Sequence, residues 1–214
     1  VTRMASASLL REALYIASQA IEDEQLPAKE RFKWEPLMQV LRKQQPLLVH
    51  AHRADDILTA LRIKDEFDIN LIIQHGTEAF MVSEELKQRQ VPVCLGPLLI
   101  NRAKVELKEV SFKNAARLAE MGVPFCLITD HPVVPVEQLR VCAALAAREG
   151  LDEQQALEAI TINAASIIGV ADRLGSITAG KRADLAIFDG HPLDFRSRLV
   201  KVMVDGLLWG DNNE

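Results

Sequence analysis

The sequence predicts an α/β fold built on a parallel sheet, and three observations carry this prediction. Short apolar runs alternate with amphipathic segments four times along the 214-residue chain. The runs are continuously apolar, which is typical of strands that helices cover on both faces or that line a barrel. Three of the runs end on a polar side chain, in the order His, His and Asp.

Two helices are expected before the first strand. One covers about residues 4 to 24, where apolar side chains recur at helical spacing, and the other covers about residues 35 to 43. Pro36 would lie in the first turn of the second helix, where its missing N–H is tolerated. The repeating apolar residues of the first helix are Leu10, Leu14, Ala17 and Ile21.

The expected strands of the sheet are Pro46–His50, Ile69–His75, Val91–Leu95 and Phe125–Asp130. Each is followed by a helix, so parallel pairing with right-handed crossovers is predicted. Asp55 or Asp56 would cap the first of these helices and Ser83 the second. Ser111 would cap the third, which should end at Gly122 in a left-handed conformation.

The pattern changes after Asp130. A helix is expected over about residues 136 to 149, Asp152 with Gln155 suggests a capping box, and Asn163 would cap a last short helical turn. The tail looks like β structure over residues 183 to 188 and 199 to 209, with a turn at Asp205-Gly206. We therefore expect a barrel-like part with C-terminal helices over residues 1–172 and a β-strand part over residues 173–214.

A closed (β/α)8 barrel needs eight strands and typically about 250 residues. Only four strand–helix units are predicted here, followed by too little β structure for an independent domain. If the fold is a barrel, the chain is its second half.

Composition excludes several classes of protein. With 49% hydrophobic and 26% charged residues, the chain has the balance of a globular protein. A net charge of −5 and a pI near 5.6 predict no basic face for nucleic acid, and no apolar run approaches the roughly 20 residues of a membrane helix. The three cysteines, Cys94, Cys126 and Cys142, suggest reduced core thiols. We expect a cytoplasmic location, although a signal peptide could precede Val1.

His50, His75 and Asp130 each end an apolar run, and the carboxyl ends of parallel strands lie side by side. The three side chains could therefore converge on one metal ion and form a hydrolytic site. Taken singly, each has an ordinary alternative: a hydrogen-bonded residue facing a loop for either histidine, and a turn or cap residue for the aspartate.

Four stretches resemble the amidohydrolase superfamily, in particular its imidazolonepropionase-related metal-dependent hydrolases. They are VHAHRADDI (49–57), QHGTE (74–78), TDHP (129–132) and GSITAGKRADL (175–185). The resemblance implies strands 5–8 of a TIM-type (β/α)8 barrel plus a remnant of a small β-sandwich domain. It also implies that His50 and His75 are the strand 5 and strand 6 metal ligands and Asp130 the strand 8 ligand. The family's strand 1 His-x-His has no counterpart, so an isolated chain would lack part of the site.

The implied activity is hydrolysis of a C–N bond in an amide, lactam or peptide-like substrate. A divalent ion, zinc by preference and otherwise iron or manganese, would lower the pKa of bound water toward about 7. Asp130 would move a proton from this water to the leaving nitrogen. His52, Arg53 and His131 are candidates for substrate binding or for orienting the ligands. For Arg53, pairing with a neighbouring aspartate is the favoured alternative.

Two rival functions stay open at this point. The chain could be a non-catalytic half-barrel whose bare sheet edges pair with another copy or with a complementary N-terminal half. It could also be an iron oxygenase, since two histidines and one carboxylate match that triad, although the 175–185 motif argues against it. The expected partners are a small amide-type substrate and the missing half or a second copy, without nucleic acid or membrane.

Overall fold

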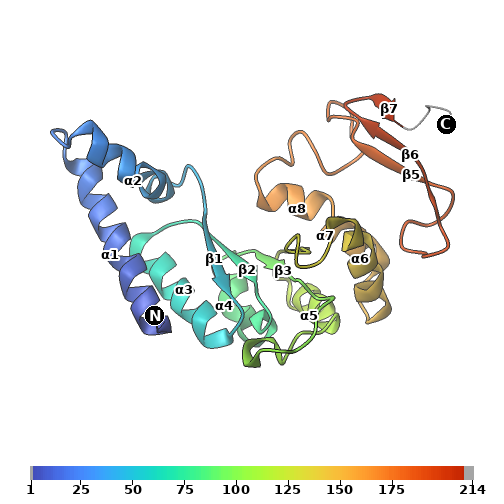
Figure 1. Ribbon diagram of the computed structural model, residues 1–214, viewed down its shortest axis with the longest axis horizontal. Helices are drawn as coiled ribbons and strands as arrows, with labels where there is room; N and C mark the ends of the chain where they lie inside the picture. Colours follow the sequence, from blue (N-terminus) through green and yellow to red (C-terminus); the bar gives the residue numbers. More distant parts are fainter. Residues whose placement is uncertain (1, 210–214) are drawn as a thin grey trace.

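A computed structural model describes residues 2–209, and its centre is a four-stranded parallel sheet (Figure 1). The strands run in the order β1-β2-β3-β4. Neighbouring strands pair in parallel along the whole sheet, so the predicted α/β fold with a parallel sheet is confirmed. The strands are β1 (Leu47–Ala51), β2 (Leu71–His75), β3 (Val93–Leu95) and β4 (Phe125–Leu127).

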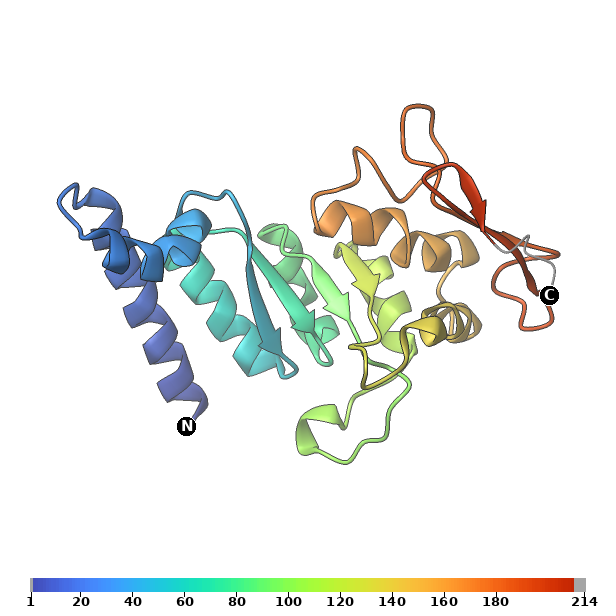
Figure 2. The ribbon, with the colours of Figure 1, turned by 45° about the horizontal axis from the view of Figure 1, so that its top comes forward.

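The helices that follow the strands cover one face of the sheet (Figure 2). These elements are α3 (Ala54–Phe67), η1 (Ala79–Val82), α4 (Ser83–Gln88), α5 (Lys113–Met121), α6 (Leu139–Arg148) and α7 (Glu153–Ala159). Two short 3-10 turns, η2 (Val105–Leu107) and η3 (Val136–Gln138), lie in the loops after β3 and β4. Ile73, Val93 and Leu95 of the sheet pack here with Leu61 and Leu118 of the helices in one buried cluster. Burying each such side chain contributes about 1.5–3 kcal/mol, so this layer fixes the sheet that carries the site.

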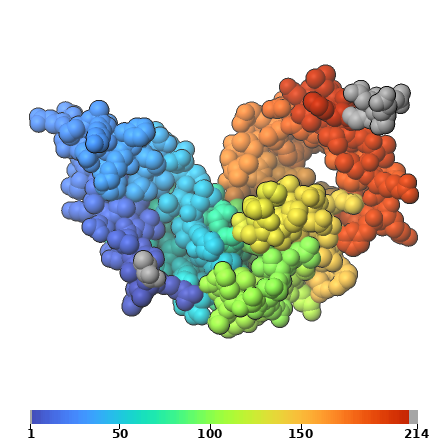
Figure 3. Space-filling view, in the orientation of Figure 1, coloured from blue at the N-terminus to red at the C-terminus, as the bar shows by residue number. Residues whose placement is uncertain are grey.

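The opposite face of the sheet is covered only in part. Cys94 and Cys126 lie there under α8 (Ile162–Ile167), in a small buried cluster. On β1, by contrast, Leu48 is 59% exposed and His50 is exposed as well. Figure 3 shows this side of the molecule as a broad concavity between the N-terminal helices and the C-terminal part. The continuously apolar strands therefore fit a sheet face that this chain leaves partly open.

The two N-terminal helices, α1 (Arg3–Glu22) and α2 (Ala28–Leu41), pack on each other beyond β1. The first lies where it was predicted. The prediction for the second was wrong at its start, because the helix begins seven residues earlier, after Pro27. Pro36 thus lies inside the helix, where Gln45 donates a side-chain hydrogen bond to its carbonyl oxygen.

Helix caps were predicted with mixed success. Asp152 accepts a hydrogen bond from the backbone of Gln155, and Gly122 ends α5 with φ of 71°, both as expected. Ser83 does not cap α4, because its hydroxyl donates to the carbonyl of Phe80 in the preceding 3-10 turn. Asn163 lies inside α8, one residue after the helix begins.

A second, antiparallel sheet follows, with strand order β5-β6-β7. Its strands are β5 (Leu185–Phe188), β6 (Leu199–Val204) and β7 (Leu207–Trp209), and the predicted turn at Asp205-Gly206 is confirmed. Arg140 of α6 donates to the carbonyl of Pro192 at 2.7 Å and so ties this part to the helices. The division of the chain at residue 172 stays a prediction, and residues 210–214 of the expected β part lie outside the described residues.

Two predictions from composition are also tested. The three cysteines are free and buried, as expected for core thiols. Over residues 2–209, no helix has both the length and the apolar character that crossing a bilayer requires.

Candidate metal centre

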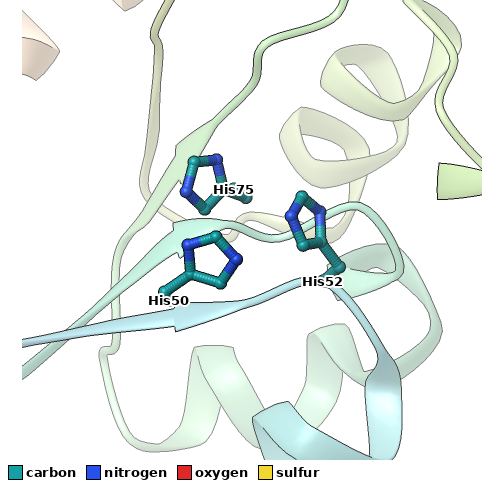
Figure 4. Close-up of side chains that lie close together, drawn as sticks. All are labelled: His50, His52 and His75. Atoms are coloured by element: carbon teal, nitrogen blue, oxygen red, sulfur yellow. The ribbon is translucent and has the colours of Figure 1, made fainter. Parts of the chain in front are cut away.

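Three histidines meet at the carboxyl ends of β1 and β2 (Figure 4). His50 lies in β1, His52 follows its last residue, and His75 ends β2. Each offers one ring nitrogen, and the three nitrogens all lie within 4.8 Å of one another. The strand register brings these side chains together. Ala51 pairs with His75, so His50 and His52, the two neighbours of Ala51 in the chain, lie on either side of His75.

His75 is held in an uncommon backbone conformation. Its φ of 75° lies in the left-handed region, which side chains other than glycine adopt at a cost of about 1–3 kcal/mol and mostly at functional sites. Its Nδ1 lies 2.7 Å from the carbonyl oxygen of Gly96. A carbonyl oxygen only accepts, so Nδ1 carries the proton and the lone pair of the neutral ring is on Nε2. Such a hydrogen bond is the usual way in which a metal-binding histidine is oriented.

His52 is buried and also has a partner for one ring nitrogen. Its Nδ1 lies 2.8 Å from the hydroxyl oxygen of Thr77. Among the described residues His50 has no such partner, and it is exposed. Its ring lies 4.2 Å from the ring of His75 and 5.0 Å from that of His52, centroid to centroid. Thus two rings are fixed by hydrogen bonds and the third completes the group.

The surroundings keep two of these rings neutral. Burial, together with the neighbouring rings of His75 and His50, lowers the pKa of His52 to about 4. Burial and the ring of His75 also lower the pKa of His50 from its usual value. Glu106 and Asp130 act in the opposite direction on the pKa of His50 without cancelling the effect. Near pH 7 both rings can therefore offer a lone pair.

Three imidazole side chains fit a divalent transition metal. Histidine nitrogens bind zinc at about 2.0–2.1 Å and also suit iron and other transition metals. The three nitrogens lie within 4.8 Å of one another, close enough for the group to hold one ion. Calcium and magnesium prefer oxygen ligands, which this group of three does not contain.

Asp130 lies apart from the three histidines. The strand β4 ends at Leu127, so Asp130 is in the loop beyond it, exposed and with φ of 53°. It is not among the residues whose ligand atoms meet within 4.8 Å. Its charge nevertheless raises the pKa of His50. Asp130 therefore lies at the same edge of the sheet, formed by the carboxyl ends of β1–β4 and called the rim below, but farther from His50 than the other two histidines. His131, next to it, is exposed. Their roles as ligand, base or substrate-binding group stay predictions.

Arg53 and Glu78 lie just before α3 and η1, respectively. Arg53 makes a two-armed ion pair with Asp55, at 2.9 and 3.0 Å, which is the alternative that the sequence favoured. The expectation that Asp55 or Asp56 caps α3 was wrong. The buried carboxylate of Glu78 accepts from the backbone N–H of Ala54 at 2.9 Å and takes this place.

Two buried polar residues near the site, Thr77 and Asn114, were not among the candidate site residues predicted from the sequence. Thr77 contacts His52, and Asn114 of α5 donates to the carbonyl of Thr77 at 3.1 Å. Thr77 lies in the QHGTE stretch, so its place in that motif was the available signal. Asn114 lies 37 residues from Thr77, and only the packing of α5 against the rim brings them together.

A cavity of about 270 Å³ opens beside His50 and His52 along the free edge of β1. Its other walls include Arg3, Asp56 and Glu106, and Arg3 pairs with the other two at 2.8 and 3.5 Å. The space beside the histidines is thus bordered by charged groups of both signs.

The sequence pattern of the Amidohydrolase family matches residues 45–208, which include both sheets and the three histidines. The chain belongs to this family. An amidohydrolase from Thermotoga maritima MSB8 is similar in structure, with a TM-score of 0.91 and 43% identity over 97% of this chain and 56% of that one. A Xaa-Pro dipeptidase with bound methionine shares the fold, at a TM-score of 0.64 and 22% identity over 82% of this chain and 47% of the other.

Curated relatives point to the same family. "Amidohydrolase tasK" of Hapsidospora irregularis is 27% identical over 96% of this chain and 23% of its own length. The imidazolonepropionase of Geobacillus kaustophilus is 43% identical over 81 residues, 36% of this chain and 19% of its own length. The chain thus spans about a quarter of the Hapsidospora relative and little more than half of the Thermotoga protein. The predicted resemblance to amidohydrolases and imidazolonepropionases is confirmed.

Proposed function

We propose that this chain is the C-terminal portion of a metal-dependent hydrolase that cleaves a C–N bond of an amide, lactam or peptide-like substrate. One observation carries the proposal: the nitrogens of His50, His52 and His75 meet within 4.8 Å at the carboxyl ends of neighbouring parallel strands. Family membership supports it, since the matched stretch includes all three residues.

His50, His52 and His75 would hold the ion through ring nitrogens. A divalent ion bound there supplies Lewis acidity, which activates water and polarises a carbonyl group. Zinc fits the imidazoles best and iron also suits them, whereas manganese, which prefers oxygen ligands, would fit them less well. Gly96 and Thr77 orient two of the rings through hydrogen bonds, so the histidines need little rearrangement on binding.

Asp130 would receive the proton of the attacking water at its carboxylate and deliver it to the leaving nitrogen. Its exposed position beyond β4 leaves it on the same rim, where its charge acts on His50. The cavity of about 270 Å³ beside His50 would take part of a small substrate. His131 and Arg53 would be further substrate-binding groups.

We also propose that the parallel sheet corresponds to strands 5–8 of a (β/α)8 barrel, and that β5–β7 are part of a composite β-sandwich domain. The similarity to 56% of the Thermotoga chain supports this, as does the exposure of Leu48 on the open face. Within residues 2–209, β1 and β4 each pair on one side only. The favoured partner is an N-terminal half-barrel, and a second copy of this chain is the alternative.

The metal site is tested by titrating the metal-free chain with zinc and with manganese in the presence of a competing chelator. We expect one ion per chain, and a loss of affinity of more than about 100-fold in His50→Ala and His75→Ala, because each substitution removes a ligand rather than a group that orients one. His191→Ala is the matched control, since His191 is half-exposed and lies far along the chain in the β part. Equal affinity in all four proteins, or no binding at all, would contradict the proposal.

Pairing with a second half is tested separately by light scattering after size-exclusion chromatography. A chain that remains a 23.8 kDa monomer at high concentration would contradict pairing between copies, whereas a dimer would contradict the preference for an N-terminal half.

A further inference from the structure

Thr77 lies where it can determine the protonation of His52. It follows Gly76 at the end of β2, its side chain is 3% exposed, and its hydroxyl oxygen is 2.8 Å from Nδ1 of His52. His52 is itself 9% exposed, so bulk water competes little for this nitrogen. The neutral ring can therefore exist with its proton on Nδ1, donated to Thr77, or on Nε2, with Nδ1 accepting from the hydroxyl.

The backbone around this contact is held on both sides. Asn114 is 1% exposed, and its side-chain amide donates to the carbonyls of Thr77, at 3.1 Å, and of Glu109, at 2.8 Å. The backbone N–H of Glu78 donates to the carbonyl of His52 at 2.8 Å. These bonds fix the segments of His52 and Thr77 relative to each other, so the surrounding backbone maintains the short distance between Nδ1 of His52 and the Thr77 hydroxyl.

We propose that Thr77 is a positioning residue of the metal centre: its hydroxyl accepts the Nδ1–H of His52, and Asn114 holds Thr77 in the place where it can do so. The proposal rests on the proposed metal-binding function and extends it to a residue outside the histidine group. It assigns to His52 the same arrangement that the Gly96 carbonyl imposes on His75, with the proton on Nδ1 and the lone pair on Nε2.

The expected consequence is a ring prepared for the ion before the ion arrives. Without an acceptor at Nδ1, a buried neutral imidazole populates both tautomers, and only one of them presents a lone pair at Nε2. Loss of a group that orients a ligand typically lowers metal affinity 10–100-fold. Thr77 would therefore act on metal binding without touching the metal.

The test uses the full 214-residue chain and compares Thr77→Val with the wild type. Valine keeps the branched shape and removes the hydroxyl. Thr77→Ser restores a hydroxyl at the same position. Ser83→Ala is the matched control, because Ser83 is also a buried residue with a hydroxyl, at the start of α4, but its hydroxyl donates to the carbonyl of Phe80 and not to a histidine of the site.

Two measurements are made on each protein. Long-range ¹H–¹⁵N NMR of the metal-free imidazoles reads the tautomer of His52, and chelator competition reads the zinc dissociation constant. We expect a single Nδ1–H tautomer in the wild type, a mixture in Thr77→Val with zinc affinity reduced about 10–100-fold, recovery in Thr77→Ser, and no change in Ser83→Ala.

A wild-type His52 with its proton on Nε2 would overturn the proposal, and this result needs no variant to be folded. Unchanged zinc affinity in Thr77→Val, with tight zinc binding by the wild type, would overturn the positioning role while leaving the proposed function intact. Absence of zinc binding in the wild type would remove the proposed function and the positioning role together, whatever the tautomer.

Discussion

The rim of the parallel sheet has two unlike sides. On the side of β1 and β2, His52 and His75 are buried and each has a short hydrogen bond to one ring nitrogen. On the side of β4, Asp130 and His131 are exposed and lie in the loop after the strand. On the first side, hydrogen bonds orient two imidazole rings. On the second, among residues 2–209, the backbone carbonyl of Asp130 accepts from Val133, and neither the Asp130 nor the His131 side chain has a hydrogen-bond partner.

For the proposed metal site, we infer from this difference that metal binding and proton transfer would depend on different sides of the sheet edge. Affinity depends on groups whose rotamers and protons are fixed before binding, since fixing them afterwards costs free energy. A group that moves protons needs access to solvent and substrate. The histidine side thus resembles a binding element and the Asp130 side resembles a catalytic one.

Gly96 connects the two sides, so replacing it should have the largest effect. Its carbonyl accepts from His75, and a Cβ added to it would lie 2.1 Å from the carbonyl oxygen of Ile128, two residues before Asp130. With φ of 143° the position is also strained for any L side chain. We expect Gly96→Ala to destabilise the chain by about 3 kcal/mol or more and to weaken zinc binding. Urea unfolding and chelator competition measure the two effects.

Gly122→Ala is the matched control for backbone strain. Gly122 has φ of 71°, but a Cβ there would meet only the end of the Lys87 side chain, at an ordinary 3.5 Å. This variant should lose about 1 kcal/mol and keep the zinc affinity of the wild type. If both alanine variants lose similar stability and neither affects zinc binding, Gly96 does not connect the two sides.

Acid should weaken the histidine side of the metal-free chain. Burial lowers the pKa of His52 to about 4, below the value of about 6.5 in an unfolded chain. Between these values the unfolded state binds more protons, so the free energy of unfolding falls as the pH decreases from 6.5 toward 4 and is unaffected above 6.5. We expect His52 to account for about 2 kcal/mol of this loss, after allowance for solvent screening.

The measurement is urea unfolding at pH 7 and pH 4.5 for the wild type and for His52→Asn. Many carboxylates titrate in the same range, so only the difference between the two proteins counts. A loss of stability that is the same in both would mean that His52 is protonated as easily in the folded chain as in the unfolded one.

The sequence predicted the sheet and the positions of two of the three histidines, because both depend on local patterns. Apolar runs placed His50 and His75 at the ends of parallel strands, and adjacency of those strands followed from the chain order. The position of His52 could not be derived, since β1 ends one residue before it and the local turn decides where its ring lies. The caps at Ser83 and Asn163 failed because both residues have local alternatives that a capping pattern does not weigh.

Contacts between distant segments were beyond the reach of such patterns. Glu78 caps α3 from 24 residues away, and Asn114 reaches Thr77 across 37 residues. Both depend on how the loops after β1, β2 and β3 pack on one another. Asp130 was also misplaced by the local pattern. Its apolar run was predicted to be a strand up to the carboxylate, but β4 ends at Leu127 and Asp130 adopts a left-handed backbone conformation in the loop that follows.

The smallest effect is expected from Asp130→Asn, which sharpens the contrast between the two sides. Asp130 is exposed and lies outside the histidine group. Bringing its carboxylate to an ion would require ordering an exposed side chain, so its net contribution to metal affinity should be small. We expect the zinc dissociation constant to rise less than about 10-fold, equivalent to about 1.4 kcal/mol, against more than about 100-fold for His75→Ala. Chelator competition on both variants under identical conditions makes the comparison. Equal losses would show that Asp130 is a ligand on the same footing as the histidines, and the division between a binding side and a catalytic side would then be wrong.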